Sequence, residues 1–196
     1  MITKTQLRIK RVFDFSLVIV FLPFLLIPII ILIVIGTIDT KSYGIYTQYR
    51  IGQHGKPFKI YKIRTLKDGK HQLGHMNKYA SKVGVFLRKS KLNELPQLFN
   101  VLIGDMSFVG PRPDLKGFAD ELKGEDRIVL LVKPGVTGPA TLKYKDEERV
   151  LERQKNPEHY NRTIIWVDKV KINKKYVENY SFYLDLTLIL KSILNK

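Results

Sequence analysis

An almost uninterrupted apolar segment near the N-terminus constrains this chain more than any other feature. Residues 12–35 are apolar except for one acid, one serine and two prolines, Asp14, Ser16, Pro23 and Pro28. A helix needs about 20 such residues to cross a bilayer. The apolar region of a signal peptide is shorter, about 7–15 residues, and a small-residue cleavage site follows it. Residues 36–39 (GTID) offer no such site, so the segment is predicted to remain as a membrane helix.

Two features favour a helix that enters the membrane, bends and returns to the same face. Pro23 and Pro28 each remove a backbone donor and clash with the preceding turn, so each predicts a kink. A kinked span would tolerate the same prolines. The flanks favour re-entry, because Lys and Arg stay on the cytoplasmic side and both flanks are basic. Residues 41–91 contain 13 Lys or Arg and a single acid, Asp68. We expect Asp14 to stay at the interface and pair with Arg11 or a neighbour.

The overall charge indicates a partner that carries phosphate. The 196-residue chain has 34 Lys and Arg against 18 acids, a formal net charge of +16. Such an excess attracts nucleic acid, lipid headgroups or nucleotide substrates. Nucleic-acid binding would rest on charge alone, since the chain has no recognisable nucleic-acid motif. The chain has no cysteine, which excludes disulfides, thiolate metal sites and a cysteine nucleophile.

The remainder is predicted to be one mainly helical α+β domain over residues 41–196, behind a membrane segment over residues 1–40. Alternating apolar and basic residues between 46 and 66 predict two short strands. Apolar periodicity predicts one helix or two short ones over 83–102, with Pro96 in the first turn of the second and Asn93 as its cap. Helices are also expected at 118–132 with a break at Gly124, at 147–154, and at 180–194, the last in the core or at the membrane interface. The Gly/Pro-rich segments 107–113 and 133–139 are predicted loops.

Several motifs occur in an order that resembles a known family. Residues 91–102 (KLNELPQLFNVL) and 104–113 (GDMSFVGPRP) carry the strongest resemblance, and 10–14 (KRVFD), 58–65 (FKIYKIRT), 133–138 (KPGVTG) and 178–181 (ENYS) support it. Together they resemble the monotopic bacterial phosphoglycosyl transferases, a sugar transferase family that starts glycan assembly on polyprenyl phosphate. The resemblance covers nearly the whole chain.

The resemblance implies a reaction in two steps. An acidic side chain attacks the β-phosphate of a UDP-sugar, expels UMP and keeps the sugar phosphate; polyprenyl (undecaprenyl) phosphate then takes it, with Mg²⁺ assisting. Cations and a metal are needed around the reacting phosphorus because charge builds on its oxygens. The resemblance also implies the cytoplasmic face of the bacterial inner membrane, contact with anionic lipids and interfacial helices, and it leaves a homodimer open.

The family's Asp-Glu catalytic pair corresponds to Asn93 and Glu94, with Glu94 also the expected metal ligand. Asn93 departs from the family, because a carboxamide is a much poorer nucleophile than a carboxylate. Three explanations stand: an inactive form, a mechanism that uses Glu94 or another acid such as Asp105, or deamidation of Asn93. An inactive relative would act as a module that binds a UDP-sugar, a lipid or a partner.

Four cations are expected to bind substrate phosphates. Arg112 stands between two prolines, which fix the backbone and aim a guanidinium suited to bidentate phosphate contact. The other three match basic positions of the family, and each has the alternative of an ordinary solvated or headgroup-binding charge; they are Lys62, Arg64 and Arg88.

Overall fold

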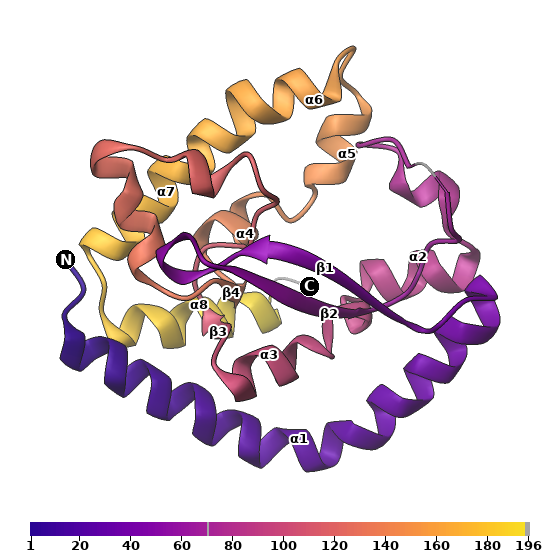
Figure 1. Cartoon of the computed structure of the whole chain (residues 1–196), viewed down its shortest axis with the longest axis horizontal. Helices are drawn as coiled ribbons and strands as arrows, with labels where there is room; N and C mark the ends of the chain where they lie inside the picture. Colours follow the sequence, from indigo (N-terminus) through magenta and orange to yellow (C-terminus); the bar gives the residue numbers. More distant parts are fainter. Residues whose placement is uncertain (70, 195–196) are drawn as a thin grey trace.

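The computed structural model describes residues 1–69 and 71–194, so the last two residues of the predicted 41–196 domain lie outside it. The described chain is mainly helical and contains two small two-stranded sheets. The predicted α+β class is therefore confirmed. Figure 1 shows the long N-terminal helix α1 beneath the remaining elements, which it supports along their length.

Helix α1 spans Lys4–Thr40 and contains both prolines. A capping box between Thr3 and Gln6 begins it, and Lys41 in the left-handed conformation ends it. A straight helix of 37 residues would be about 55 Å long. Instead α1 bends below the domain and rises toward it at its C-terminal end (Figure 1). This bend agrees with the kinks expected of internal prolines.

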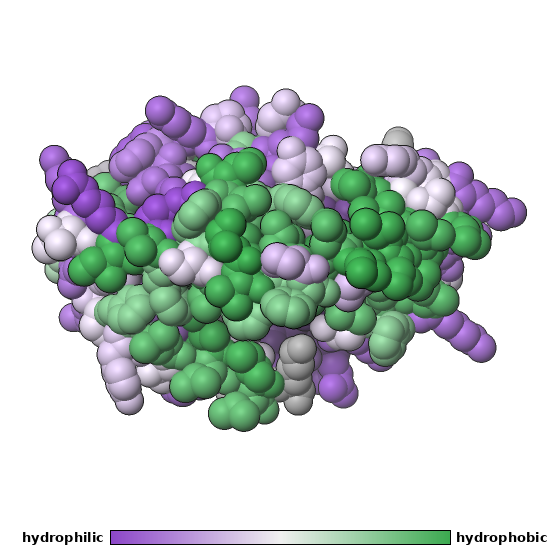
Figure 2. All heavy atoms as spheres, turned by 90° about the horizontal axis from the view of Figure 1, so that it is seen from below, coloured by the Kyte–Doolittle hydropathy of each residue, from purple (hydrophilic) through white to green (hydrophobic). Residues whose placement is uncertain are grey.

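Most of α1 faces away from the domain. Its most apolar stretch is long and hydrophobic enough to cross a membrane, and 17% of that stretch is buried. The core helix of a soluble protein would be mostly buried instead. Figure 2 shows a broadly hydrophobic surface on the side where α1 lies. The opposite side of α1 places Val18 in a cluster with Phe58 and Met106, so the helix belongs to the folded unit and is not a detachable leader.

The two predicted strands form an antiparallel hairpin. Strand β1 (Ile45–Ile51) pairs with β2 (Pro57–Ile63), and a short 3-10 turn, η1 (Gln53–Gly55), connects them. The register sets Tyr46 opposite Lys62 and Arg50 opposite Phe58. Successive side chains of a strand alternate between faces, so Lys62, Phe58 and their partners share one face. That face buries Phe58 against α1 and α3.

The helical segment predicted over 83–102 consists of two helices. Helix α2 (Lys82–Lys89) and α3 (Gln97–Ile103) flank a 3-10 turn, η3 (Leu92–Glu94). Pro96 precedes α3 as its N-cap residue, and no side chain caps this helix. The prediction that Asn93 caps the second helix was therefore wrong. Asn93 lies inside η3, where its side chain faces the interior.

The two Gly/Pro-rich segments predicted as loops contain a second sheet. Strand β3 (Ser107–Val109) pairs in parallel with β4 (Gly135–Thr137). Three glycines allow the close approach, because a Cβ on Gly138 would lie 2.1 Å from the carbonyl oxygen of Gly110 and one on Gly135 would lie 2.1 Å from the Gly110 nitrogen. Three-residue strands are too short for a periodic sequence signal.

The remaining elements wrap around these sheets. The region 118–132, predicted to be a broken helix, forms 3-10 turns on either side of the predicted break. Beyond β4 the chain is almost entirely helical, which confirms the helices expected at 147–154 and 180–194. The bounds are η2 (Met76–Tyr79), η4 (Ala119–Glu121), η5 (Gly124–Leu131), α4 (Pro139–Lys143), α5 (Glu147–Glu152), α6 (Pro157–Tyr160), the π-helical turn η6 (Asn161–Ile165), α7 (Trp166–Glu178) and α8 (Phe182–Leu194).

A buried ion pair fastens the start of α1 to α8. Lys10 donates to the carboxylate of Asp185, and both side chains are at most 5% exposed. The hydroxyls of Tyr176 and Tyr180 donate to the same carboxylate, at 2.6 and 3.2 Å. A buried charge needs such partners, because its desolvation would otherwise cost several kcal/mol.

The predicted pairing of Asp14 with Arg11 was wrong. Its carboxylate is buried and accepts a hydrogen bond from the backbone nitrogen of Phe108, at the start of the Gly/Pro segment. Arg11 instead donates to the carbonyl oxygens of Val101 and Leu102. Both carbonyls belong to the last turn of α3, where few backbone donors remain; Val101 O also accepts from Gly104 N at 3.1 Å. Arg11 thus caps α3.

We expect Asp185→Ala to lower the free energy of unfolding by about 3–5 kcal/mol, because it leaves Lys10 buried without a counter-charge. Thermal unfolding of the detergent-solubilised protein measures the loss. Glu125→Ala is the matched control, since it breaks an exposed pair with Lys174 and such pairs contribute at most about 1 kcal/mol. Equal losses in the two variants would contradict the conclusion that the buried Lys10–Asp185 pair stabilises the fold more than an exposed pair.

Candidate active site

Glu94 is the centre of a buried charged cluster. It ends η3 and is 9% exposed. The chain enters η3 through Lys91, whose φ of 62° lies in the left-handed region. Such a conformation costs a non-glycine residue about 1–2 kcal/mol and is usually retained where the surrounding structure enforces it. This turn directs Glu94 toward the β1–β2 hairpin.

Two cations from distant parts of the sequence meet at Glu94. Lys62 Nζ and Arg112 Nη2 both lie 2.9 Å from Glu94 Oε1. Burial by itself would raise the pKa of Glu94, but the charges of Arg112, Lys62 and Lys91 outweigh it and hold the pKa well below its ordinary value. The carboxylate therefore stays ionised throughout the physiological pH range. The sequence had predicted Glu94, Lys62 and Arg112 as site residues, and the structure brings these three together.

The cations are perturbed in opposite directions. Burial lowers the pKa of Lys62 to about 8, although Glu94 partly opposes this shift. The pKa of Arg112 is raised, chiefly by the charge of Glu94. Of the two cations that contact Glu94, Lys62 is thus the one whose charge lies nearer to titration at neutral pH.

The segment that carries Arg112 is held on both sides. The nitrogen of Gly110 donates to Thr137 O at 2.9 Å, and Gly135 N donates to Pro111 O at 2.8 Å. On the other side, Ile51 N of β1 donates to Asp114 O at 2.9 Å. Backbone bonds to two sheets, together with the flanking prolines, fix the position of the guanidinium.

Asn93 lies beside Glu94 and is 7% exposed. Its Oδ1 atom is buried without a hydrogen-bond partner in the described chain. The hydrogen bonds from Lys62 and Arg112 to Glu94 are both made to Oε1. Asn93 thus presents an oxygen that no donor of the described chain satisfies, beside the ionised carboxylate of Glu94.

These oxygens fit a magnesium ion that is also held by a substrate. The described residues contain no group of three His, Cys, Asp or Glu side chains able to hold a metal unaided. Mg²⁺ is usually held by one or two side chains together with substrate phosphates and waters. Asn93 Oδ1 and the Glu94 carboxylate match that pattern.

The other two predicted phosphate ligands have different neighbours. Arg64 donates to Tyr43 O and pairs with Asp68. Arg88 pairs with Glu148 at 2.8 Å. Neither contacts Glu94 in the described structure, and their roles in substrate binding stay predictions.

Two further charged residues of the cluster were missed from the sequence. Lys91 is exposed, and its charge helps to lower the pKa of Glu94. Asp114 follows the PRP segment, and burial raises its pKa to about 7 although Lys169, Arg50 and Arg112 oppose this shift. Lys91 is the first residue of the motif at 91–102, so its place in that motif could have identified it. The burial of Asp114 has no sequence signal, because α7 and β1 supply its neighbours.

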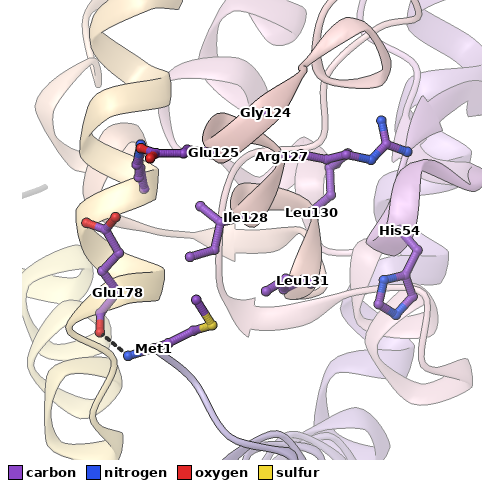
Figure 3. Close-up of a pocket in the computed structure, with 10 residues that line it drawn as sticks. Met1, His54, Gly124, Glu125, Arg127, Ile128, Leu130, Leu131 and Glu178 are labelled. Atoms are coloured by element: carbon purple, nitrogen blue, oxygen red, sulfur yellow. Dashed lines mark hydrogen bonds and ion pairs between the residues drawn. The ribbon is translucent and has the colours of Figure 1, made fainter.

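A cavity of about 650 Å³ lies elsewhere, between η1, η5, α7 and the N-terminus. Ile128, Leu131 and Met1 line its apolar part (Figure 3), and the terminal ammonium donates to Glu178 O at its edge. None of the predicted site residues lines it. The charged cluster and this cavity are therefore separate places.

Comparison with known proteins agrees with the sequence motifs. A family model described as "Bacterial sugar transferase" matches residues 5–196. An uncharacterized sugar transferase of Bacillus subtilis is 34% identical over 92% of this chain and 83% of its own length. A UDP-glucose:undecaprenyl-phosphate glucose-1-phosphate transferase of Klebsiella pneumoniae is 33% identical over 86% of this chain. The match covers 36% of that longer protein.

A similar relationship holds for a protein of Aeromonas hydrophila. Its name is UDP-N-acetylgalactosamine-undecaprenyl-phosphate N-acetylgalactosaminephosphotransferase, and it is 27% identical over 94% of this chain and 43% of its own length. The two longer relatives thus share one region of their length with nearly all of this chain.

The shifted pKa of Asp114 predicts a pH-dependent stability. An unfolded aspartate titrates near 3.8 and the folded one near 7, so between these values the folded state holds a proton that the unfolded state has lost. Stability should therefore fall as pH rises from about 4 to 7. Asp114→Asn should remove this loss, so that the melting temperature of the variant exceeds that of the wild type by more at pH 8 than at pH 5.

Melting curves at both pH values check this prediction. The matched control is Asp146→Asn, at an exposed position, which should keep the pH dependence of the wild type. An Asp114→Asn variant that keeps it too would contradict the raised pKa.

Proposed function

The chain belongs to the bacterial sugar transferase family, and we propose that it transfers a sugar 1-phosphate from a UDP-sugar to undecaprenyl phosphate and releases UMP. The names of the Klebsiella and Aeromonas relatives state this type of reaction. The bond between the β-phosphorus and the oxygen bridging to the α-phosphate breaks. A phosphate oxygen of the lipid finally forms the new bond to the β-phosphorus, which gives a lipid diphosphate sugar. No external oxidant or reductant is needed.

The observation that carries this proposal is the buried Glu94 between Lys62 and Arg112. Phosphoryl transfer places charge on the phosphoryl oxygens, and preorganised cations stabilise that charge. When a diphosphate enters, Lys62 and Arg112 can share their donors between its oxygens and Glu94. Arg112 suits bidentate contact, and its tethered backbone keeps it from moving as charge develops.

We include Mg²⁺ in the proposal, held by the Glu94 carboxylate and Asn93 Oδ1 together with the substrate diphosphate. The Oδ1 atom of Asn93, buried without a hydrogen-bond partner in the described chain, supports this placement. A bound Mg²⁺ would neutralise phosphate charge and make UMP a better leaving group.

The family reaction proceeds through a covalent phosphosugar-enzyme intermediate, and we propose that Asn93 impairs this step here. A carboxylate oxygen would attack the β-phosphorus and later leave again. The carboxamide of Asn93 carries no negative charge and is a poor nucleophile. Glu94 is a poor substitute, because its depressed pKa and two cation contacts reduce its basicity. Asp105 follows α3 near Arg11 and Lys133, so nothing in its surroundings favours it as a replacement.

The same observations support a second function, a non-catalytic module that binds a UDP-sugar, a lipid or a partner. Asn93 leaves the site one negative charge short of an Asp-Glu pair, which would strengthen the binding of an anionic diphosphate. Binding without turnover would distinguish this function from the transferase.

We propose that α1 is a re-entrant helix on the cytoplasmic face of the inner membrane. Both of its ends contact the same domain: Lys10 pairs with α8, and Gly36 packs against the backbone of Arg64. A helix whose two ends join one folded body cannot place them on opposite sides of a bilayer. The exposed apolar residues of α8, Tyr183, Leu190, Ile193 and Leu194, suit contact with the membrane interface and its anionic lipids. A homodimer remains part of the proposal.

Release of UMP tests the transferase proposal. The purified chain is incubated with a panel of UDP-sugars, undecaprenyl phosphate and Mg²⁺, beside Asn93→Asp. We expect slow release from this chain and a rise of at least about tenfold in the variant, which corresponds to a barrier lowered by about 1.4 kcal/mol. Asn93→Ala is the matched control and should not gain activity. Absence of release from both this chain and Asn93→Asp would refute the reaction.

Cysteine labelling tests the topology. The chain has no cysteine of its own, so Thr5→Cys and Tyr43→Cys each create one exposed thiol. A membrane-impermeant maleimide should modify both variants in inside-out vesicles and neither in right-side-out vesicles. Modification of the two variants from opposite sides would mean that α1 spans the membrane.

A further inference from the structure

Arg50 of β1 is a half-buried cation that lacks a carboxylate partner in the described chain. Its Nη2 donates to Gln48 Oε1 at 2.7 Å, and its Nη1 lies 3.3 Å from Pro113 O. The Nε atom is buried without a hydrogen-bond partner. No salt bridge within 4.0 Å joins Arg50 to an acid of the described chain. Buried guanidinium groups are normally paired, because desolvating a charge is costly.

The position of Arg50 directs it toward the candidate active site. In the hairpin register Arg50 faces Phe58 and Lys62 faces Tyr46, so alternation puts Arg50 and Lys62 on the same face. Lys62 on that face reaches Glu94 at 2.9 Å. Arg50 also contacts the carbonyl of Pro113, the residue that follows Arg112. The charge of Arg50 thus lies on the Lys62 side of the cluster and next to the Arg112 segment.

The charges around Arg50 are unfavourable in the absence of a ligand. Burial, and next the charge of Arg112, lower the pKa of Arg50. Glu94 is already shared by Lys62 and Arg112. Asp114 has a raised pKa of about 7, so it is only partly charged at neutral pH. The site therefore holds more positive charge than its own acids compensate.

We propose that Arg50 binds a phosphate group of a substrate, and that this anion supplies the missing counter-charge. The inference rests on the proposed function and extends it, because neither the motifs nor the predicted phosphate ligands include Arg50. The phosphate belongs either to the nucleotide or to the lipid. Each Nη atom of Arg50 carries a second N–H beyond its contact with Pro113 or Gln48, and the two together can offer the phosphate a bidentate contact.

The alternative is a purely structural role, in which Arg50 braces Gln48 and Pro113. The two roles predict opposite effects on stability and binding. A bracing residue stabilises the protein without ligand, so its removal lowers the melting temperature. A cation held for a ligand destabilises the free protein, so its removal leaves the melting temperature unchanged or raises it while binding weakens.

The test compares Arg50→Gln, Arg50→Lys and the wild type as full-length, detergent-solubilised proteins. Binding of UDP is measured by calorimetry, binding of undecaprenyl phosphate in mixed micelles, and the melting temperature without ligand. Arg50→Gln should weaken binding of one of the two probes by about 10- to 100-fold, the loss expected for charge-assisted hydrogen bonds, without a lower melting temperature. Arg50→Lys keeps the charge and should restore part of the affinity. Arg149→Gln, at an exposed position on α5, is the control and should match the wild type.

The probe that loses affinity identifies the source of the phosphate. Unchanged affinity for both probes in Arg50→Gln would overturn the inference, whatever its melting temperature. Should Arg50→Gln not fold, Arg50→Lys decides: a lower melting temperature with unchanged affinity means bracing, and weaker binding at an unchanged melting temperature supports the inference. A wild-type protein that binds neither probe would refute the proposed function and this inference with it.

Discussion

The double contact at Glu94 Oε1 is the interaction on which the arrangement of the site depends. It joins η3, β2 and the PRP segment. Glu94 lies 32 positions from Lys62 and 18 positions from Arg112 in the sequence. A carboxylate that is 9% exposed has lost most of its hydration, and two cations replace that hydration. The same cations are those that a phosphoryl group requires. One electrostatic constraint therefore maintains both the local fold and the candidate chemistry.

The membrane helix is connected to this site through polar contacts on its inner side. Asp14 of α1 accepts from Phe108 N, four residues before Arg112, and Arg11 caps α3, which follows Glu94. The outer side of the same helix is exposed and apolar (Figure 2). In the proposed membrane placement, the lipid-facing side of α1 and the charged side chains bound to the domain would together fix the distance between the site and the bilayer surface. Such a fixed distance suits an enzyme with one soluble and one lipid substrate.

Asn93 and Arg50 together make the candidate active site electropositive. A carboxamide stands where the family has a carboxylate, and a half-buried guanidinium lacks an acid within 4.0 Å in the described chain. Both features make the electrostatic free energy of binding a diphosphate more favourable. Both also destabilise the site when no anion is bound. Anion binding and nucleophilic chemistry thus make different demands on the same few residues.

The sequence by itself determined the apolar helix, the hairpin, the helical content and the membership of Glu94, Lys62 and Arg112 in one site. Periodicity, proline and charge act locally, and the motifs occur in a fixed order, so these features need no knowledge of the fold. Only the tertiary structure decided that β3 and β4 pair, that Asn93 is not a cap, and that Arg11 and Asp14 have separate partners. It also decided that Arg50 and Asp114 lie half-buried near Arg112. Each of these depends on contacts between segments far apart in the chain. The physical reason is that burial and charge pairing are properties of surroundings, which a residue acquires only when distant segments pack around it.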